Sequence, residues 1–139
     1  MHIEKNILDN ILGTLLELDG RNKDTFKSRF DLEKIGIRKS LHMKLDTDGK
    51  KYTCAHARYC LKRDGKKQLC QYLSHCTYPD GFCASMSKCV KLQTQKISGL
   101  KTHDCHILLQ RALPAGLRGL VGPDIYEAIA DLGKIFKSL

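Results

Sequence analysis

The chain has 139 residues, enough for one domain with its own core, and its 42% hydrophobic and 28% charged residues exclude a disordered or fibrous protein. Its 24 Lys and Arg residues against 15 Asp and Glu residues give a formal charge of +9. This charge favours a polyanionic partner, above all nucleic acid, although basic residues spread over a solvated surface would give the same total.

No apolar run approaches the roughly 20 residues of a membrane-spanning helix, and residues 1–5 do not resemble a signal peptide. We therefore expect a nuclear or cytoplasmic location and no membrane partner. The seven cysteines would stay reduced there, and their odd number prevents a complete set of internal disulfides.

The first predicted elements are two helices. Apolar residues at helical spacing from Ile3 to Leu18 predict a helix that ends at Gly20, where a left-handed cap is easiest. A shorter helix is expected over residues 23–34, with Asn22 as its N-cap.

A small β-hairpin is predicted next, because apolar residues alternate over 41–45 and the turn residues 46–49 precede Tyr52 and Cys54. Asp64 is expected to cap a third helix that ends before a turn at residues 78–81. Its predicted buried face carries Leu69, Tyr72, Leu73 and Cys76.

The last third of the chain predicts short extended pieces at 90–92 and 97–100, followed by two helices. The first helix should run over residues 103–113, with Thr102 as its cap and Pro114 as its breaker. The second should run over 124–137 after Gly122 and Pro123.

These elements predict one predominantly α-helical α+β unit over residues 1–139, with about five helices and a small hairpin. Its N-terminal helices and the start of the hairpin lie in residues 1–49, a Cys-rich middle in 50–98 and the C-terminal helices in 99–139.

Three stretches of sequence resemble the transposases of plant CACTA (En/Spm-like) elements in order and spacing. The first comprises MHIEKN at 1–6, DNILGTLL at 9–16, KDT at 23–25 and RFDL at 29–32. The second is IGIRKSLH at 35–42, and the third is GLKTHDCHILLQR at 99–111 with LP at 113–114 and LRGL at 117–120. The chain departs from the family at Thr53, Cys54 and Ala55, where a Pro-Pro-Ala run is usual.

The resemblance implies a DNA transposase whose ribonuclease-H-like core binds Mg²⁺ or Mn²⁺ through three acidic residues, and this chain would be an insertion-like segment of such an enzyme. The resemblance places two of those acids before the first motif and the third after the last predicted helix. The chain itself is therefore expected to be non-catalytic and to need no cofactor. The residues that match the family motifs most closely are His2, Glu4, Lys5, Asn6, His103, Asp104, His106, Gln110 and Arg111.

Two of these motifs carry side chains that invite a chemical role. Glu4 is acidic within a motif, but a Glu in the first turn of a helix is also favoured by the helix dipole. His103 and His106 are three residues apart, so both imidazoles could reach a metal ion; alternatively His103 and Asp104 cap the helix and His106 packs against the core.

The remaining cysteines lack the close pairs of zinc fingers and ribbons. Cys54 with His56, and His75 with Cys76, come nearest to ligand pairs, but neither has a second pair at the usual spacing. A small zinc-stabilised module is one alternative for this region. The other alternative is that most of these cysteines are buried thiols.

The densest basic cluster consists of Lys62, Arg63, Lys66 and Lys67, which could bind phosphates without reading bases, or could cover a solvated turn. The resemblance thus implies a non-catalytic segment of a CACTA-type transposase that binds DNA weakly or not at all. A second hypothesis is a domesticated, non-catalytic protein that binds DNA or transposase chains through its basic surface or through exposed apolar faces, which could also lead to self-association.

Overall fold

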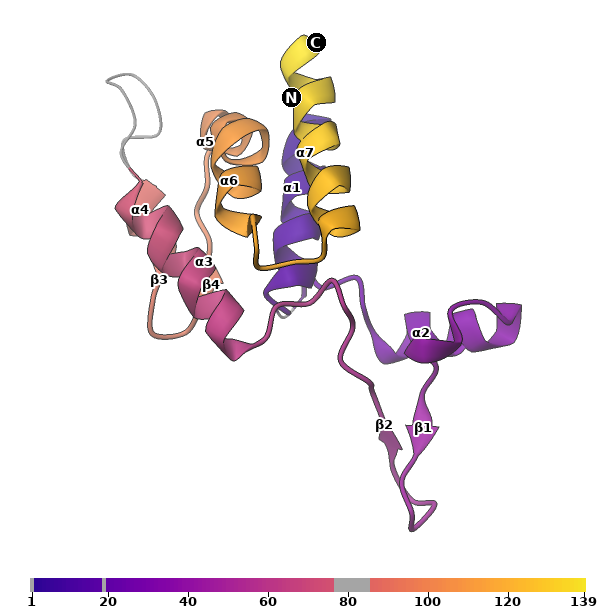
Figure 1. The fold of residues 1–139 in the computed structure, drawn as a ribbon. Helices are drawn as coiled ribbons and strands as arrows, with labels where there is room; N and C mark the ends of the chain where they lie inside the picture. Colours follow the sequence, from indigo (N-terminus) through magenta and orange to yellow (C-terminus); the bar gives the residue numbers. More distant parts are fainter. Residues whose placement is uncertain (1, 19, 77–85) are drawn as a thin grey trace.

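The computed structural model describes residues 2–18, 20–76 and 86–139. Its main helices and strands are shown in Figure 1. In chain order the elements are α1 (His2–Leu15), α2 (Phe26–Ile35), the 3₁₀ turn η1 (Lys39–Leu41), β1 (Lys44–Leu45), β2 (Tyr52–Thr53), α3 (Arg63–His75), α4 (Met86–Cys89), β3 (Val90–Lys91), β4 (Lys96–Ile97), α5 (Thr102–Ile107), the π-helical segment η2 (Leu108–Ala112), α6 (Leu113–Leu117) and α7 (Pro123–Ser138).

The fold is predominantly helical with two small antiparallel hairpins, which confirms the predicted α+β class. In the first hairpin Lys44 pairs with Thr53 and Leu45 with Tyr52, as the turn chemistry predicts. The second hairpin was not predicted: Val90 pairs with Ile97, which joins two segments expected to be separate extended pieces.

Helix α1 ends at Leu15, so the predicted end at Gly20 is wrong. Glu17 takes the left-handed conformation (φ 53°), and its N–H donates to the Thr14 carbonyl at 3.4 Å. The N–H of Leu18 reaches back to the Gly13 carbonyl at 2.8 Å, and this pair of bonds is a Schellman motif. Leu18 is buried, so the contact of its side chain with the core outweighs the conformational cost at Glu17.

Two predicted N-caps are also wrong. Thr25, not Asn22, caps α2, because its side chain and that of Ser28 form a reciprocal capping box. The Asn22 side chain instead accepts a hydrogen bond from the Asp24 N–H at 2.8 Å, which shapes the turn before the helix. Lys62 occupies the N-cap position of α3, and Asp64 lies in the first turn.

The buried face of α3 is narrower than predicted. Leu69 and Leu73 are fully buried, whereas Tyr72 is 40% exposed and Cys76 is only partly buried. Cys70 takes the remaining core position. The predicted turn at 78–81 lies outside the described residues.

The helical path continues past Pro114, so the predicted break there is wrong. Residues 108–112 adopt a π turn just before the proline, and this wider turn suits a residue that cannot donate a backbone hydrogen bond. The predicted cap at Thr102 is wrong as well, since Thr102 is the first helical residue and Lys101 occupies the N-cap position. Helix α7 confirms the prediction for 124–137 to within one residue at each end.

The main core lies between α1, α3, the β3–β4 hairpin and the helical run from α5 to α6, and most of its side chains are leucines. A smaller apolar cluster of Leu41, Ala57 and Cys60 lies beneath α2. Helix α7 packs closely on η2 at Gly133, where an added Cβ would lie 2.7 Å from the Leu109 carbonyl oxygen.

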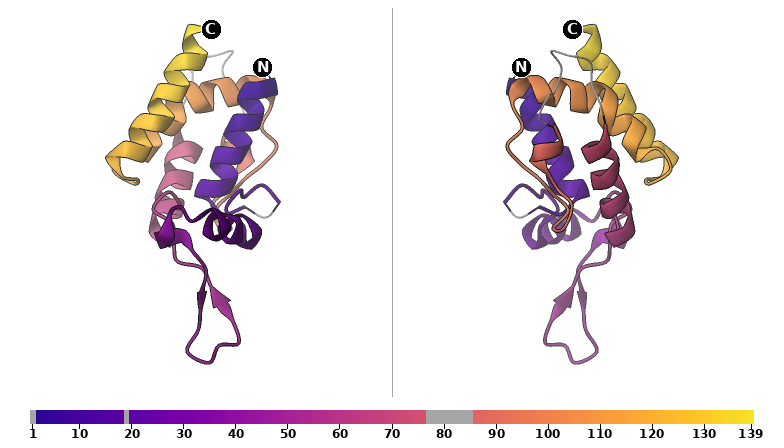
Figure 2. Two further views of the ribbon diagram at one scale, coloured as in Figure 1. Left: turned by 90° about the vertical axis from the view of Figure 1, so that its right-hand side faces the viewer. Right: turned by 90° about the vertical axis from the view of Figure 1, so that its left-hand side faces the viewer.

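The β1–β2 hairpin extends beyond the helices, with α2 beside its base (Figure 1). Figure 2 shows the hairpin projecting in the same way in two further views. Among the described residues, none of the helices has the length and apolar character to cross a membrane.

Candidate functional site

Two sequence motifs that are about 100 residues apart meet through three side chains, Glu4, His106 and Gln110, which we call the motif cluster. Glu4 is 3% exposed, and its carboxylate accepts hydrogen bonds from His106 Nδ1 and, at 3.0 Å, from Gln110 Nε2. His106 and Gln110 are one helical turn apart, so both side chains face α1. The hydrogen bonds of the cluster hold α1 against the helical run from α5 to η2.

The motif cluster also fixes the orientation of His106. An ionised carboxylate can only accept hydrogen bonds, so with Glu4 ionised His106 carries a proton on Nδ1 for this contact. In the neutral imidazole Nε2 is then the nitrogen with a lone pair. The His106 side chain is 24% exposed. The arrangement is therefore suited to holding one oriented imidazole near the surface.

The neighbouring motif residues lie around this cluster. Asp104 is buried, and its Oδ2 accepts a hydrogen bond from the Lys101 N–H at 3.0 Å. It thereby gives a partner to a backbone N–H at the start of α5 that would otherwise have none within the helix. His103 and Arg111 are exposed on the helical run, while Lys5 is partly buried and Asn6 exposed on α1. His2 is the first residue of α1.

Among the metal-ligand candidates, Cys54 and His56 each contact another group of the protein. Cys54 and His56 line the same hollow of about 260 Å³, but the Cys54 thiol contacts Met43 Sδ and His56 Nε2 contacts the Cys60 carbonyl at 2.8 Å. In the part of the chain that the structure describes, no three His, Cys, Asp or Glu side chains are grouped to hold a metal ion.

A buried ion pair organises the region around α2. Arg29 is 3% exposed and donates two hydrogen bonds to Asp24, from Nε to Oδ1 at 2.7 Å and from Nη2 to Oδ2 at 2.6 Å. Its remaining nitrogen, Nη1, donates to the Ala55 carbonyl at 2.6 Å and more weakly to that of Leu41 at 3.5 Å. The hydrogen bonds from Arg29 hold the pKa of Asp24 below its ordinary value. One guanidinium thus joins α2 to both ends of the β1–β2 hairpin.

The positive charge of the protein is concentrated in one region. Residues 26–67 contain 13 of the 24 Lys and Arg residues but 5 of the 15 Asp and Glu residues, so they carry +8 of the formal +9. We call this region the basic lobe; it comprises α2, η1, the β1–β2 hairpin and the segment that enters α3. Three of these cations pair with acidic residues outside the range: Arg29 with Asp24, Arg58 with Asp124 and Lys66 with Glu17. The excess on the surface of the lobe is therefore smaller than +8, and it still attracts polyanions more strongly than an even distribution would.

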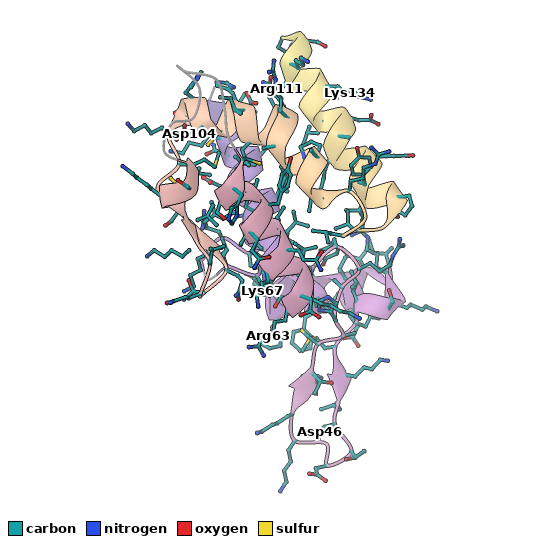
Figure 3. The ribbon with its side chains drawn as sticks, turned by 60° about the vertical axis from the view of Figure 1, so that its left-hand side comes forward. Asp46, Arg63, Lys67, Asp104, Arg111 and Lys134 are labelled. Atoms are coloured by element: carbon teal, nitrogen blue, oxygen red, sulfur yellow. The ribbon has the colours of Figure 1, made fainter. Side chains whose placement is uncertain are left out.

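The sequence-predicted basic cluster lies at the edge of this lobe. Lys62, Arg63 and Lys67 are exposed at the N-terminal end of α3, and Figure 3 shows Arg63 and Lys67 above the base of the hairpin. Lys66 is partly buried, with its Nζ 3.7 Å from Glu17 Oε1. The charge of Lys66 is therefore partly neutralised by Glu17. Within the described residues, Lys62, Arg63 and Lys67 have no acidic side chain within 3.7 Å.

The motif cluster and the basic lobe lie at different ends of the molecule. Asp104, beside the motif cluster, and Asp46, in the hairpin, are at opposite ends of the view in Figure 3. A partner bound along the basic lobe would thus leave the motif cluster uncovered.

The buried cysteines should be poor nucleophiles in the folded protein. Burial raises the pKa of Cys60 to about 11 and that of Cys105 to about 11, while Cys54 is exposed. Because the thiolate is the reactive form, we expect brief alkylation at pH 8 to label Cys54 and to leave Cys60 and Cys105 at least roughly tenfold less modified. Peptide mass spectrometry checks this, with denatured protein as the control for equal labelling. Rapid labelling of Cys105 in the folded protein would contradict the packing of α5 against α1.

Comparison of the chain with protein-family models, with curated proteins and with solved structures found no match.

Proposed function

We propose that this chain is a non-catalytic segment of a CACTA-type DNA transposase and that it binds DNA through the phosphate backbone. The observation that carries the DNA-binding part is the basic lobe, with +8 of the formal charge in 42 residues. Cations on such a surface displace the counterions of DNA, which gives affinity without base recognition.

The transposase part of the proposal depends on the sequence resemblance. The resemblance joins the motif at residues 1–6 with the motif at 99–111, and Glu4 of the first contacts His106 and Gln110 of the second. A direct contact between two motifs distant in sequence is what a shared structural role would require. We propose that the ribonuclease-H-like core and its metal-binding acids belong to other parts of the parent transposase.

The decisive experiment is a salt titration of the protein binding to duplex DNA of mixed sequence. The slope of log K against log salt should be steeper than about −3, because each phosphate contact contributes about 0.9. Changing Lys62, Arg63 and Lys67 to Gln should reduce that slope by about 2–3. The matched control changes Lys88, Lys91 and Lys96, all exposed around the other hairpin, to Gln and should leave the slope unchanged.

Two results would overturn this proposal. An absence of salt-dependent binding by the unaltered protein would remove the DNA-binding function. Nicking of supercoiled plasmid in Mg²⁺ or Mn²⁺ would show that the chain has its own catalytic acids.

A second candidate function is a domesticated role in binding transposase chains or a second copy of this protein. An apolar hollow of about 330 Å³ favours it; Ile11 and Leu15 of α1 and Ile125 and Ile129 of α7 line this hollow. Sedimentation at increasing protein concentration, with and without DNA, separates this candidate from the first. Metal analysis of the purified protein tests the further alternative of a zinc-stabilised module.

A further inference from the structure

The β1–β2 hairpin is exposed on both of its faces. All four of its ladder residues, Lys44, Leu45, Tyr52 and Thr53, are exposed, and the ribbon projects beyond the helices in every view (Figures 1 and 2). An isolated two-stranded hairpin is marginally stable in water, so a structure that keeps one in this position must hold it at its base.

The base of the hairpin is held by two contacts from α2. Arg29 donates to the carbonyl of Leu41, before β1, and to that of Ala55, after β2. Tyr52 packs edge-on against Phe30, with ring centroids 5.1 Å apart. The hairpin is thereby oriented by a buried charge and an aromatic pair rather than by strand pairing alone.

The polar groups of the ribbon suit a nucleic acid groove. Lys44, Lys50 and Lys51 are exposed along it. The Asp46 carboxylate is used within the turn, where Oδ1 accepts from the N–H of Asp48 at 3.0 Å and of Lys50 at 3.3 Å. Asp48 is exposed at the tip of the turn.

The dimensions point to one groove. Paired strands lie about 4.8 Å apart, and a two-stranded ribbon with its side chains fits the major groove of B-form DNA, which is about 12 Å wide. The minor groove, about 6 Å wide, is too narrow for a ribbon that carries Lys44 on β1 and Lys50 and Lys51 just before β2.

We propose that the β1–β2 hairpin lies in the major groove of duplex DNA, with Lys44, Lys50 and Lys51 on the flanking phosphates. This inference rests on the proposed DNA binding and adds the element and the groove. The exposed cluster at the start of α3 then contacts the backbone beside the groove.

The test uses the full chain and a duplex of mixed sequence. Dimethyl sulfate methylates guanine N7 in the major groove, and saturating protein should roughly halve this methylation. Changing Lys44, Lys50 and Lys51 to Gln should abolish the protection and lower the salt slope by about 2–3. The control with Lys88, Lys91 and Lys96 changed to Gln should keep both the protection of N7 and the salt slope. Circular dichroism of each variant checks that the fold is kept.

The outcomes separate this inference from the function on which it rests. Salt-dependent binding without protection of N7, displacement by the minor-groove ligand distamycin, or binding to single strands alone would each overturn the hairpin assignment while leaving DNA binding in place. An absence of binding by the unaltered protein would instead remove the proposed function, and the hairpin assignment with it.

Discussion

Replacing Arg29 with Met should lower the free energy of unfolding by about 3–5 kcal/mol, as expected when one partner of a buried ion pair is removed. The change leaves the Asp24 carboxylate without its guanidinium and the Ala55 carbonyl without its hydrogen-bond donor. Both charged side chains are buried, with 3% of Arg29 and 9% of Asp24 exposed, so water cannot replace the lost partner. Urea unfolding followed by circular dichroism measures the loss.

Two comparisons identify the cause of this loss. Lys27→Met on the same helix is an exposed control and should change stability by less than about 0.5 kcal/mol. The double variant with Asp24→Leu and Arg29→Met should recover part of the loss, because no unpaired charge stays buried. An Arg29→Met protein within about 1 kcal/mol of the unaltered one would contradict the role of Arg29 as the organising contact.

The same pair makes stability depend on pH in one direction. The pKa of Asp24 is lowered in the folded state from its ordinary value of 3.8. The stabilisation that the ionised Asp24 gives to the folded state is therefore complete above pH 3.8, and it is lost as the pH falls toward the lowered pKa. Arg29→Met should remove this dependence.

The helices could be predicted because their apolar spacing is a local property. Helix α7 shows this best, since its residues repeat at helical spacing after a proline that favours the first turn. The ends were harder to predict because they depend on tertiary contacts. Glu17 ends α1 in a conformation that glycine would favour, and it does so because Leu18 is needed in the core.

The functional regions were only partly predictable for the same reason. Lysines and arginines can be counted in a sequence, so the basic cluster of Lys62, Arg63, Lys66 and Lys67 could be named in advance; its contact with DNA stays a prediction. Arg29 was missed because an arginine is ordinarily expected at the surface, whereas Arg29 is buried. Its partners at 24, 41 and 55 are brought together only by the folded chain.

Glu4→Ala should lower the free energy of unfolding by about 2–3 kcal/mol, because it leaves two side-chain donors, on His106 and Gln110, without their acceptor. Glu4→Gln should cost only about 1 kcal/mol, since its amide oxygen can still accept from Gln110. Asn6→Ala, exposed in the same motif, is the control and should be within about 0.5 kcal/mol of the unaltered protein.

A readout at the imidazole separates this contact from general packing of α1. With Glu4 present, the neutral His106 should carry its proton on Nδ1, whereas the amide of Glu4→Gln can donate to Nδ1 and favour the Nε2–H tautomer. Nitrogen NMR of the His106 ring distinguishes the two tautomers. An unchanged tautomer together with unchanged stability would mean that the two motifs are not joined through Glu4.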